Sequence, residues 1–276
     1  MNFMENASMD NKSDILHRFF SLEGKTALVT GSSSGIGREI AVSFAEAGAV
    51  VAVHGRDSDR LLETCKIIDR NHGKALPFKA DLMETENCRK LTEDIYKAFG
   101  RIDILVNCAS INRRKPISDI SPEDFDEIVS VNLKSLYFLS QAVHPIMKSH
   151  GGGKIIHIGS LNTFYGLDTV SVYGMTKGGI GQLTKVMAVE WAADNIQVNC
   201  IVPGFFSTPL IKPLLADEKK EKWLRNRIPA RRIGNTDELV GVAILLSSDA
   251  SSYITGQNFV VDGGFLAGGS WNRDEV

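Results

Sequence analysis

The stretch from Thr26 to Gly48 constrains the fold most, because an apolar run, a glycine-rich turn and an amphipathic segment follow one another there. Residues 27–29 are all apolar, as in a strand buried inside a parallel sheet. Three glycines then interrupt any regular period, and apolar residues recur behind them at the spacing of one helical face. The glycines are Gly31, Gly35 and Gly37, and the apolar helix positions are Ile36, Ile40 and Phe44.

A glycine turn that opens a helix can bind a phosphate group. Without a Cβ the backbone approaches a ligand closely, and the free N–H groups and positive dipole end of the helix point at it. The spacing here is G-x-x-x-G-x-G, which departs from the commonest dinucleotide pattern, G-x-G-x-x-G. The turn therefore favours a pyrophosphate site, and a tight corner between strand and helix is the alternative.

From Lys25 onward, short apolar runs alternate with longer segments of helical period. The apolar runs cover 50–54, 75–80 and 102–107, and the helical segments cover 61–69 and 88–100. This alternation is typical of a doubly wound α/β fold, with a mainly parallel sheet between two layers of helices. Right-handed crossovers bring the carboxyl ends of the strands, and with them a ligand site, to one edge of the sheet.

Length and composition limit the number of domains and the classes of partner. With 276 residues, 43% of them apolar and 23% charged, the chain is expected to form one catalytic domain over residues 22–276. A net charge of −2 gives no general attraction to nucleic acid or anionic membranes. No run approaches the ~20 apolar residues that cross a bilayer.

Residues 1–21 are expected to form a flexible N-terminal arm, because they lack the basic start and continuous apolar stretch of a secretory signal. The cysteines show no C-x-x-C spacing, so neither a metal site nor a disulfide framework is expected, and a reducing cytoplasm fits best. The four cysteines are Cys65, Cys88, Cys108 and Cys200.

The end of the second predicted strand bears on the choice of cofactor. In a dinucleotide fold, an acidic residue there accepts from the adenosine 2′-hydroxyl, whereas an arginine suits a 2′-phosphate. The chain reads His54-Gly55-Arg56 at this point, and Asp57 and Asp59 more plausibly cap a helix that starts near Arg60. Arg56 therefore favours NADP(H), with NAD(H) possible and an ordinary solvated arginine as the alternative.

Ser160, Tyr173 and Lys177 form a candidate catalytic set. Tyr173 and Lys177 are four residues apart, so on a helix they project from the same face. A nearby ammonium favours the phenolate, which makes a tyrosine usable as an acid or base near neutral pH. Ser160 follows the apolar run at 154–158 and can donate to a substrate carbonyl oxygen, or simply cap a turn. His157 is discounted, because strand alternation places it on the other face.

Together these residues identify the chain as similar to the short-chain dehydrogenase/reductase family over about Leu22 to Phe265. The motifs that carry the resemblance are TGSSSGIG at 30–37, NCAS at 107–110, Asn132, Ser160, YGMTK at 173–177, PGFFST at 203–208 and VDGG at 261–264. The resemblance implies a Rossmann-type, seven-stranded sheet, an NAD(P)-dependent oxidoreductase and a homotetramer.

The resemblance also implies roles for individual residues. Asn132 would fix a proton-relay water, Ser160 would steady the carbonyl, Tyr173 would donate the proton, and Lys177 would lower the pKa of Tyr173 and hold the nicotinamide ribose. Asp81 resembles the acid that holds the adenine ring. The expected cofactor-binding residues are Gly31, Ser33, Ser34, Gly35, Ile36, Gly37, Arg56, Asp81, Leu82, Asn107, Tyr173, Lys177, Pro203, Gly204 and Thr208.

The chain departs from the family pattern at two positions. Ser110 stands where the family usually has the glycine of Asn-Asn-Ala-Gly, which predicts a backbone further from the cofactor. Ser34 occupies a position where many NADP-preferring members carry Lys or Arg. Arg56 is then the single basic residue in favour of NADP(H).

The loop after Ser110 suggests the substrate. It carries Arg113, Arg114 and Lys115, and a guanidinium can hold a carboxylate with two hydrogen bonds. This loop resembles the branch of sugar-acid reductases that contains gluconate 5-dehydrogenase, in which an arginine matching Arg114 faces the substrate carboxylate. A solvated or intersubunit charge cluster is the alternative. The segment 205–227 is expected to form a helical lid over the substrate.

The sequence thus predicts a cytoplasmic, NADP(H)-preferring enzyme that moves a hydride between nicotinamide and a secondary alcohol or ketone, with a sugar acid or polyol as substrate. A reductase of 3-oxoacyl thioesters is the first alternative, and it would not depend on Arg114. A cofactor-sensing protein without turnover is the second, and the complete set of candidate catalytic residues argues against it.

Overall fold

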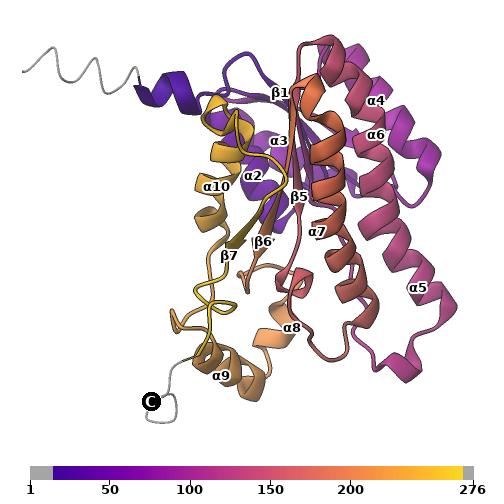
Figure 1. Ribbon diagram of the computed structural model, residues 1–276, viewed down its shortest axis with the longest axis vertical. Helices are drawn as coiled ribbons and strands as arrows, with labels where there is room; N and C mark the ends of the chain where they lie inside the picture. The colour runs from indigo at the N-terminus through magenta and orange to yellow at the C-terminus, as the bar shows by residue number, and fades with distance from the viewer. Residues whose placement is uncertain (1–14, 270–276) are drawn as a thin grey trace, which may run out of the picture.

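A seven-stranded parallel sheet runs through the centre of the molecule (Figure 1), as seen in a computed structural model that describes residues 15–269. The strand order is β3-β2-β1-β4-β5-β6-β7, and every neighbouring pair is parallel. This confirms the predicted Rossmann-type, doubly wound α/β fold. The strands are β1 (Thr26–Val29), β2 (Val50–Gly55), β3 (Lys74–Lys79), β4 (Ile104–Asn107), β5 (Gly153–Ile158), β6 (Ile196–Pro203) and β7 (Asn258–Val261).

Helices cover both faces of the sheet, in the three layers that the alternation predicts (Figure 1). One face carries α2 (Gly35–Glu46), α3 (Ser58–Arg70) and α10 (Val240–Ser247). The other carries α4 (Thr85–Phe99), α6 (Ser135–Ser149) and α7 (Ser171–Trp191), and α5 (Pro122–Val129) leads into α6. Two short helices, α8 (Lys212–Leu215) and α9 (Glu218–Arg227), lie beyond one end of the sheet.

Strand β1 shows why the central strands are largely apolar. Ala27 and Val29 pack into the core with α2, α3 and α10, whereas Leu28 packs into the core with α4, α6 and α7. All three side chains are fully buried. Successive residues of a strand point to opposite faces, so a sheet covered on both sides favours apolar residues at consecutive positions.

Polar caps set several helix boundaries. The carboxylate of Asp57 accepts from the backbone N–H groups of Asp59 and Arg60, so α3 begins at Ser58, two residues before the predicted start. Asp59 lies inside the first turn and is not the cap. Ser121 and Asp124 form a reciprocal capping box at α5. Such caps satisfy N–H groups that have no partner inside the helix.

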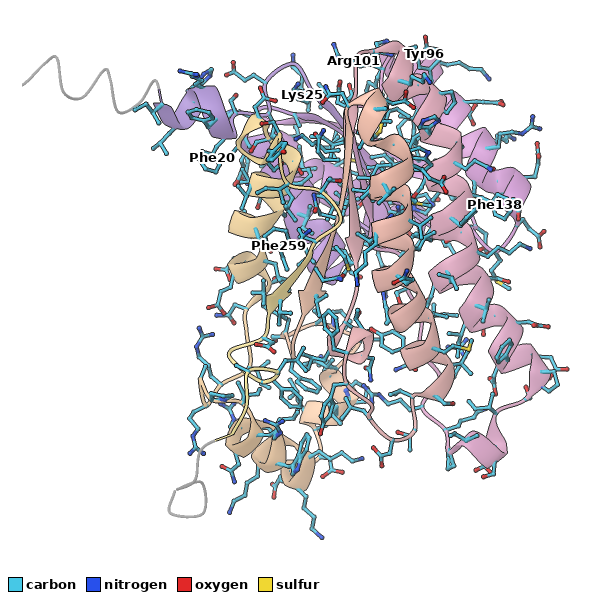
Figure 2. The ribbon with its side chains drawn as sticks, in the orientation of Figure 1. Phe20, Lys25, Tyr96, Arg101, Phe138 and Phe259 are labelled. Carbon is cyan, nitrogen blue, oxygen red and sulfur yellow. The ribbon has the colours of Figure 1, made fainter. Side chains whose placement is uncertain are left out.

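The two ends of the sheet differ. Figure 2 shows Lys25 and Arg101 at the end where the strands begin, opposite to α8 and α9. The strands end on the side of α8 and α9, where the ligand site was expected. Among residues 15–269, no helix is long and apolar enough to span a membrane. Residues 15–20 of the predicted arm are helical and exposed, and residues 1–14 lie outside the described part.

Candidate active site

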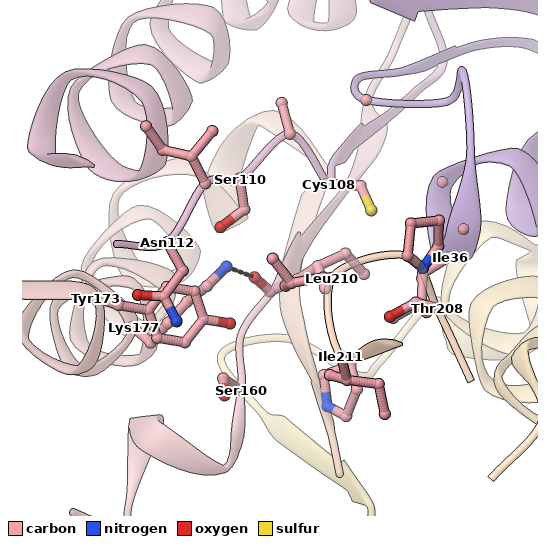
Figure 3. A pocket seen from close by; sticks show the side chains of 18 of the residues that line it. Ile36, Cys108, Ser110, Asn112, Ser160, Tyr173, Lys177, Thr208, Leu210 and Ile211 are labelled. Atoms are coloured by element: carbon pink, nitrogen blue, oxygen red, sulfur yellow. Dashed lines mark hydrogen bonds between the residues drawn. The ribbon is translucent and has the colours of Figure 1, made fainter. Parts of the chain in front are cut away.

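A cavity of about 380 Å³ opens at the carboxyl ends of the central strands (Figure 3). The glycine turn, the ends of β2, β4, β5 and β6, the start of α7 and the segment before α8 form its walls. Of the residues predicted to be catalytic or to bind cofactor or substrate, all but Asn107 and Asn132 line it. The predicted residues in the wall are Gly31, Ser33, Ser34, Gly35, Ile36, Gly37, Arg56, Asp81, Leu82, Arg114, Ser160, Tyr173, Lys177, Pro203, Gly204 and Thr208.

The glycine turn combines a structural and a binding feature. A Cβ on Gly37 would come within 2.5 Å of the carbonyl oxygen of Gly31, so this glycine is required for the turn itself. Gly35 begins α2 with a φ of +55°, and a Cβ there would project toward Thr208 and Pro209 on the opposite wall. Ser34, the N-cap residue, makes no side-chain cap bond. The first N–H groups of α2 therefore face the cavity, as phosphate binding requires.

Arg38 holds this turn against α3. Its guanidinium donates to the carbonyl oxygen of Ser33 at 2.6 Å, to Thr64 Oγ1 at 3.0 Å and to Glu63 at 2.8 Å. Arg38 thus uses its charge inside the protein, one turn away from the predicted pyrophosphate position.

His54 also supports the turn, a role that was not predicted from the sequence. Its Nε2 lies 3.2 Å from the carbonyl oxygen of Ala80, so Nε2 carries the proton, and Nδ1 accepts from the N–H of Gly31 at 3.4 Å. Burial lowers the pKa of His54 to about 4. The ring is therefore neutral near pH 7. The signal in the sequence was a histidine inside an otherwise apolar strand.

At the adenosine end of the cavity, Arg56 and Asp81 face each other. Arg56 Nη1 lies 4.0 Å from Asp81 Oδ2, and about half of each side chain is exposed. No carboxylate ends β2, because the strand closes with Gly55. A ligand at this end therefore meets both the guanidinium of Arg56 and the carboxylate of Asp81.

Tyr173 and Lys177 project from the same face of α7, as predicted (Figure 3). Lys177 is buried, donates to the carbonyl oxygen of Ile158 at 2.7 Å, and has its Nζ 5.5 Å from the centre of the Tyr173 ring. Within residues 15–269 no carboxylate pairs with this ammonium. Its positive charge is thus directed at the tyrosine and the cavity.

Ser160 follows the end of β5 and caps a turn, which was the alternative role in the sequence, and it also lines the cavity. Its Oγ accepts from the N–H of Asn162 at 3.2 Å, which caps the short turn Leu161–Thr163, and it also lines the cavity with Tyr173. The hydroxyl hydrogen reaches only Asn162 Oδ1, at 3.4 Å. It can therefore be donated to a carbonyl oxygen in the cavity.

Asn132 lies behind the cavity wall. It belongs to a π-helical turn over Ser130–Lys134 between α5 and α6 and is 1% exposed. Its Oδ1 accepts from the N–H of Ile111 at 2.8 Å, and its Nδ2 donates to the carbonyl oxygen of the same residue at 2.9 Å. Turns of this kind are common at functional sites. Here the turn lets one side chain fix both polar groups of the loop at residue 111.

Two further polar residues lie outside the cavity wall. Asn107 closes β4, is buried, and donates to Ser140 Oγ at 3.1 Å. His157 contacts Thr184 Oγ1 at 3.0 Å on α7, and burial together with the charge of Lys177 lowers its pKa to about 3. His157 is therefore neutral and has no direct access to a ligand.

The three cations of the loop after Ser110 differ in their surroundings. Arg113 donates to both carboxylate oxygens of Glu127 on α5, at 3.0 and 2.9 Å, and Lys115 pairs with Asp124 of the same helix. Arg114 lines the cavity and has no ion pair or hydrogen bond with any residue in 15–269. Of the three, Arg114 is the one whose charge is available to a ligand.

The segment after β6 covers the cavity. Phe205, Thr208 and Leu210 line it, and α8 and α9 follow. Leu224 of α9 is buried in an apolar cluster with Leu161 and Phe265. The segment is helical at α8 and α9, which pack on the turn after Ser160. Neither helix contributes a residue to the cavity wall, so the lid over the substrate stays a prediction.

The donor set of the cavity fits a dinucleotide. Four features supply the groups that phosphate, ribose and nicotinamide require. They are a helix N-terminus free of side-chain caps, a glycine whose Cβ would project toward Thr208 and Pro209, an arginine at the adenosine end, and a buried lysine beside a tyrosine. Among residues 15–269, no group of three His, Cys, Asp or Glu could hold a metal ion. Fold and site together define an NAD(P)-dependent oxidoreductase.

Comparison with known proteins identifies the family. A family model described as enoyl-(acyl carrier protein) reductase matches residues 31–266. The chain belongs to the short-chain dehydrogenase/reductase family, as its motifs predicted.

Its relatives include several sugar-acid dehydrogenases. A 2-dehydro-3-deoxy-D-gluconate 5-dehydrogenase of Bacillus subtilis is 41% identical, over 91% of this chain and 98% of that protein. A gluconate 5-dehydrogenase of Gluconobacter oxydans is 39% identical, over 89% and 96%. The crystal structure of a gluconate 5-dehydrogenase from Burkholderia cenocepacia, in complex with NADP and tartrate, is 38% identical with a TM-score of 0.88, over 92% and 99%.

Proposed function

We propose that the protein is an NADP(H)-preferring oxidoreductase that interconverts a secondary alcohol and a ketone in a sugar acid or polyol, in the manner of gluconate 5-dehydrogenase. The observation that carries this proposal is Arg114, which lines the cavity with Ser160 and Tyr173 while its two cationic neighbours are neutralised by α5. A guanidinium without a carboxylate partner suits a substrate carboxylate. The sugar-acid relatives support the same class.

In the proposed reduction, the protein supplies a proton and holds the ketone. The reduced nicotinamide, when bound, supplies the hydride to the carbonyl carbon. Tyr173 donates its phenolic proton to the carbonyl oxygen, so that ketone, hydride and proton give a secondary alcohol. Ser160 donates a hydrogen bond to the same oxygen, and the charge of Lys177 stabilises the phenolate that remains. Asn132 is a positioning residue that acts through the backbone of residue 111.

The preference for NADP(H) rests on Arg56. It lies at the adenosine end of the cavity, and β2 ends without the acidic residue that would accept from a 2′-hydroxyl. The complexes of related enzymes with NADP support this preference.

A substrate panel combined with Arg114→Ala tests the proposal. We expect NADPH oxidation with 5-keto-D-gluconate, and a fall of about 100-fold in kcat/KM in Arg114→Ala, because a charge-assisted pair contributes up to about 3 kcal/mol. Arg113→Ala is the matched control, since Arg113 is paired with Glu127. Equal effects of the two substitutions would show that the loop acts only through its overall charge.

A 3-oxoacyl thioester reductase is the second candidate. The apolar wall residues Leu167, Val170 and Leu210 favour it, as does the acyl-carrier description of the family model. Turnover of an acetoacetyl thioester that is faster than that of 5-keto-D-gluconate, and insensitive to Arg114→Ala, would establish this alternative.

We also propose that residues 22–276 act as one catalytic domain of a cytoplasmic homotetramer. The free cysteines at 65, 88, 108 and 200 support a reducing compartment. Exposed apolar side chains on α5, α6 and α7, such as Phe125, Tyr137 and Val189, support association. Light scattering after size exclusion would test the tetramer, and a monomer at micromolar concentration would contradict it.

A further inference from the structure

Two polar atoms of the cavity wall are buried without a partner. Ser110 Oγ and Asn112 Oδ1 have no hydrogen bond with any residue in 15–269, although both residues line the cavity. Figure 3 shows their side chains in the cavity together with Ser160 and Tyr173. Buried polar atoms are almost always hydrogen-bonded, because leaving one unpaired forfeits its interaction with water. At a cavity wall, the ligand is the partner that remains.

The loop that carries these atoms is fixed. Asn132 binds both the N–H and the carbonyl oxygen of Ile111, the residue between Ser110 and Asn112. The backbone of Cys108 and that of Ala109 both donate to Thr30 Oγ1, at 3.0 and 3.1 Å. Because the backbone is held on both sides of Ser110 and directly before Asn112, the two side chains are preorganised for a ligand.

Polar residues along this loop alternate in direction. Ser110, Asn112 and Arg114 line the cavity, whereas Arg113 and Lys115 pair with carboxylates of α5. The cavity wall therefore presents a hydroxyl, an amide and a guanidinium at every second residue. A ligand that satisfies all three has neutral polar groups beside a negative charge.

We propose that Ser110 and Asn112 form a subsite that recognises hydroxyl groups of the substrate, next to the carboxylate at Arg114. A hydroxyl both donates and accepts, so it can satisfy the serine hydroxyl and either atom of the amide. An alkyl chain would leave both side chains unpaired, and sites built for hydrogen bonds discriminate strongly against such analogues. This inference rests on the proposed function and specifies which substrates it selects.

Asn112→Leu, which keeps the branched shape of the side chain and removes the amide, provides the test. Three ketones separate the two recognition elements: 5-keto-D-gluconate carries hydroxyls and a carboxylate, L-erythrulose only hydroxyls, and 5-oxohexanoate only a carboxylate. We expect Asn112→Leu to lower kcat/KM about 10- to 100-fold for the two hydroxylated ketones and by less than about threefold for 5-oxohexanoate. Ser110→Ala should give a smaller change of the same pattern.

Controls separate the subsite from a general disturbance. Ile111→Val changes the residue between the two side chains. It should alter kcat/KM slightly, and by the same factor for all three ketones. NADPH affinity, measured by fluorescence, should be unchanged in Asn112→Leu and Ser110→Ala. A loss of NADPH affinity in Ser110→Ala would assign that hydroxyl to the cofactor and overturn its part of the proposal.

The remaining outcomes distinguish this subsite from the proposed function. If Asn112→Leu lowers kcat/KM equally for all three ketones, or does not lower it, the subsite is overturned and the sugar-acid function is left intact. Wild-type turnover of L-erythrulose but not of 5-keto-D-gluconate would contradict the sugar-acid function, and loss of that turnover in Asn112→Leu would still support the subsite. A wild-type preference for 5-oxohexanoate over both hydroxylated ketones would overturn the subsite.

Discussion

The two halves of the cavity are built differently. In the glycine turn, contacts inside the protein already engage His54 and Arg38, and what faces the ligand is backbone at the start of α2. In the loop after residue 109, the backbone is held and side chains face the ligand, with Ser110, Asn112 and Arg114 lacking partners within residues 15–269. A backbone site is unaffected by most changes of side chain, whereas a side-chain site changes its chemistry with each substitution.

Tyr173→Phe gives the largest expected effect, and it tests whether chemistry can be separated from cofactor binding. Loss of the phenolic proton should lower kcat about 1,000-fold, within the range for a general acid. NADPH affinity should change less than about threefold, because the glycine turn and Arg56 are untouched. Stopped-flow turnover and fluorescence titration measure the two quantities. Unchanged activity would favour a cofactor sensor, and an equal loss of affinity would contradict the separation of the two halves.

Acid should destabilise the protein through two buried histidines, His54 at the glycine turn and His157 in β5. Folding lowers the pKa of His54 to about 4 and that of His157 to about 3, from 6.5, so the unfolded chain takes up protons first as the pH falls below 6.5. The stabilisation is present above that pH and is lost toward pH 4. Between pH 7.5 and 5 the free energy of unfolding should fall by about 2 kcal/mol per histidine.

Urea denaturation at these two pH values measures the loss, and His157→Gln should reduce it by about half. The same pH dependence in wild type and His157→Gln would show that other groups cause it. The activity of His157→Gln near pH 7 should equal that of the wild type, because this ring does not line the cavity.

Arg56→Ala should have a smaller effect, confined to the adenosine end. Removing one partly exposed guanidinium should weaken the binding of NADPH about tenfold and that of NADH less than about twofold. Dissociation constants for both cofactors from fluorescence give the ratio, and Arg60→Ala, an exposed neighbour paired with Asp57, is the control. Equal weakening of NADPH and NADH would contradict a role in binding the 2′-phosphate.

The same difference between the halves explains what the sequence could predict. Strands β1 to β5, helices α2, α3, α4 and α7 and the glycine turn follow from period and spacing, because a buried parallel sheet leaves few choices at each position. The number of strands was implied by the family resemblance and not by the spacing. Lys177 and Tyr173 were predictable because a helix fixes residues four apart on one face. The bidentate contact of Asn132 with Ile111 was not, since it depends on a π-helical turn that no periodicity marks. The pairing of Arg113 and Lys115 with α5 likewise required the positions of distant carboxylates.

The π-helical turn at Ser130–Lys134 has a consequence for how such enzymes diverge. It places the anchor of the loop, Asn132, on a different segment from the side chains that meet the ligand. Substitutions at 110, 112 and 114 can therefore exchange the chemical groups of the rim while the backbone stays where Asn132 holds it. Single replacements can therefore change the substrate range while each variant keeps the fold. In this way one scaffold can host many activities.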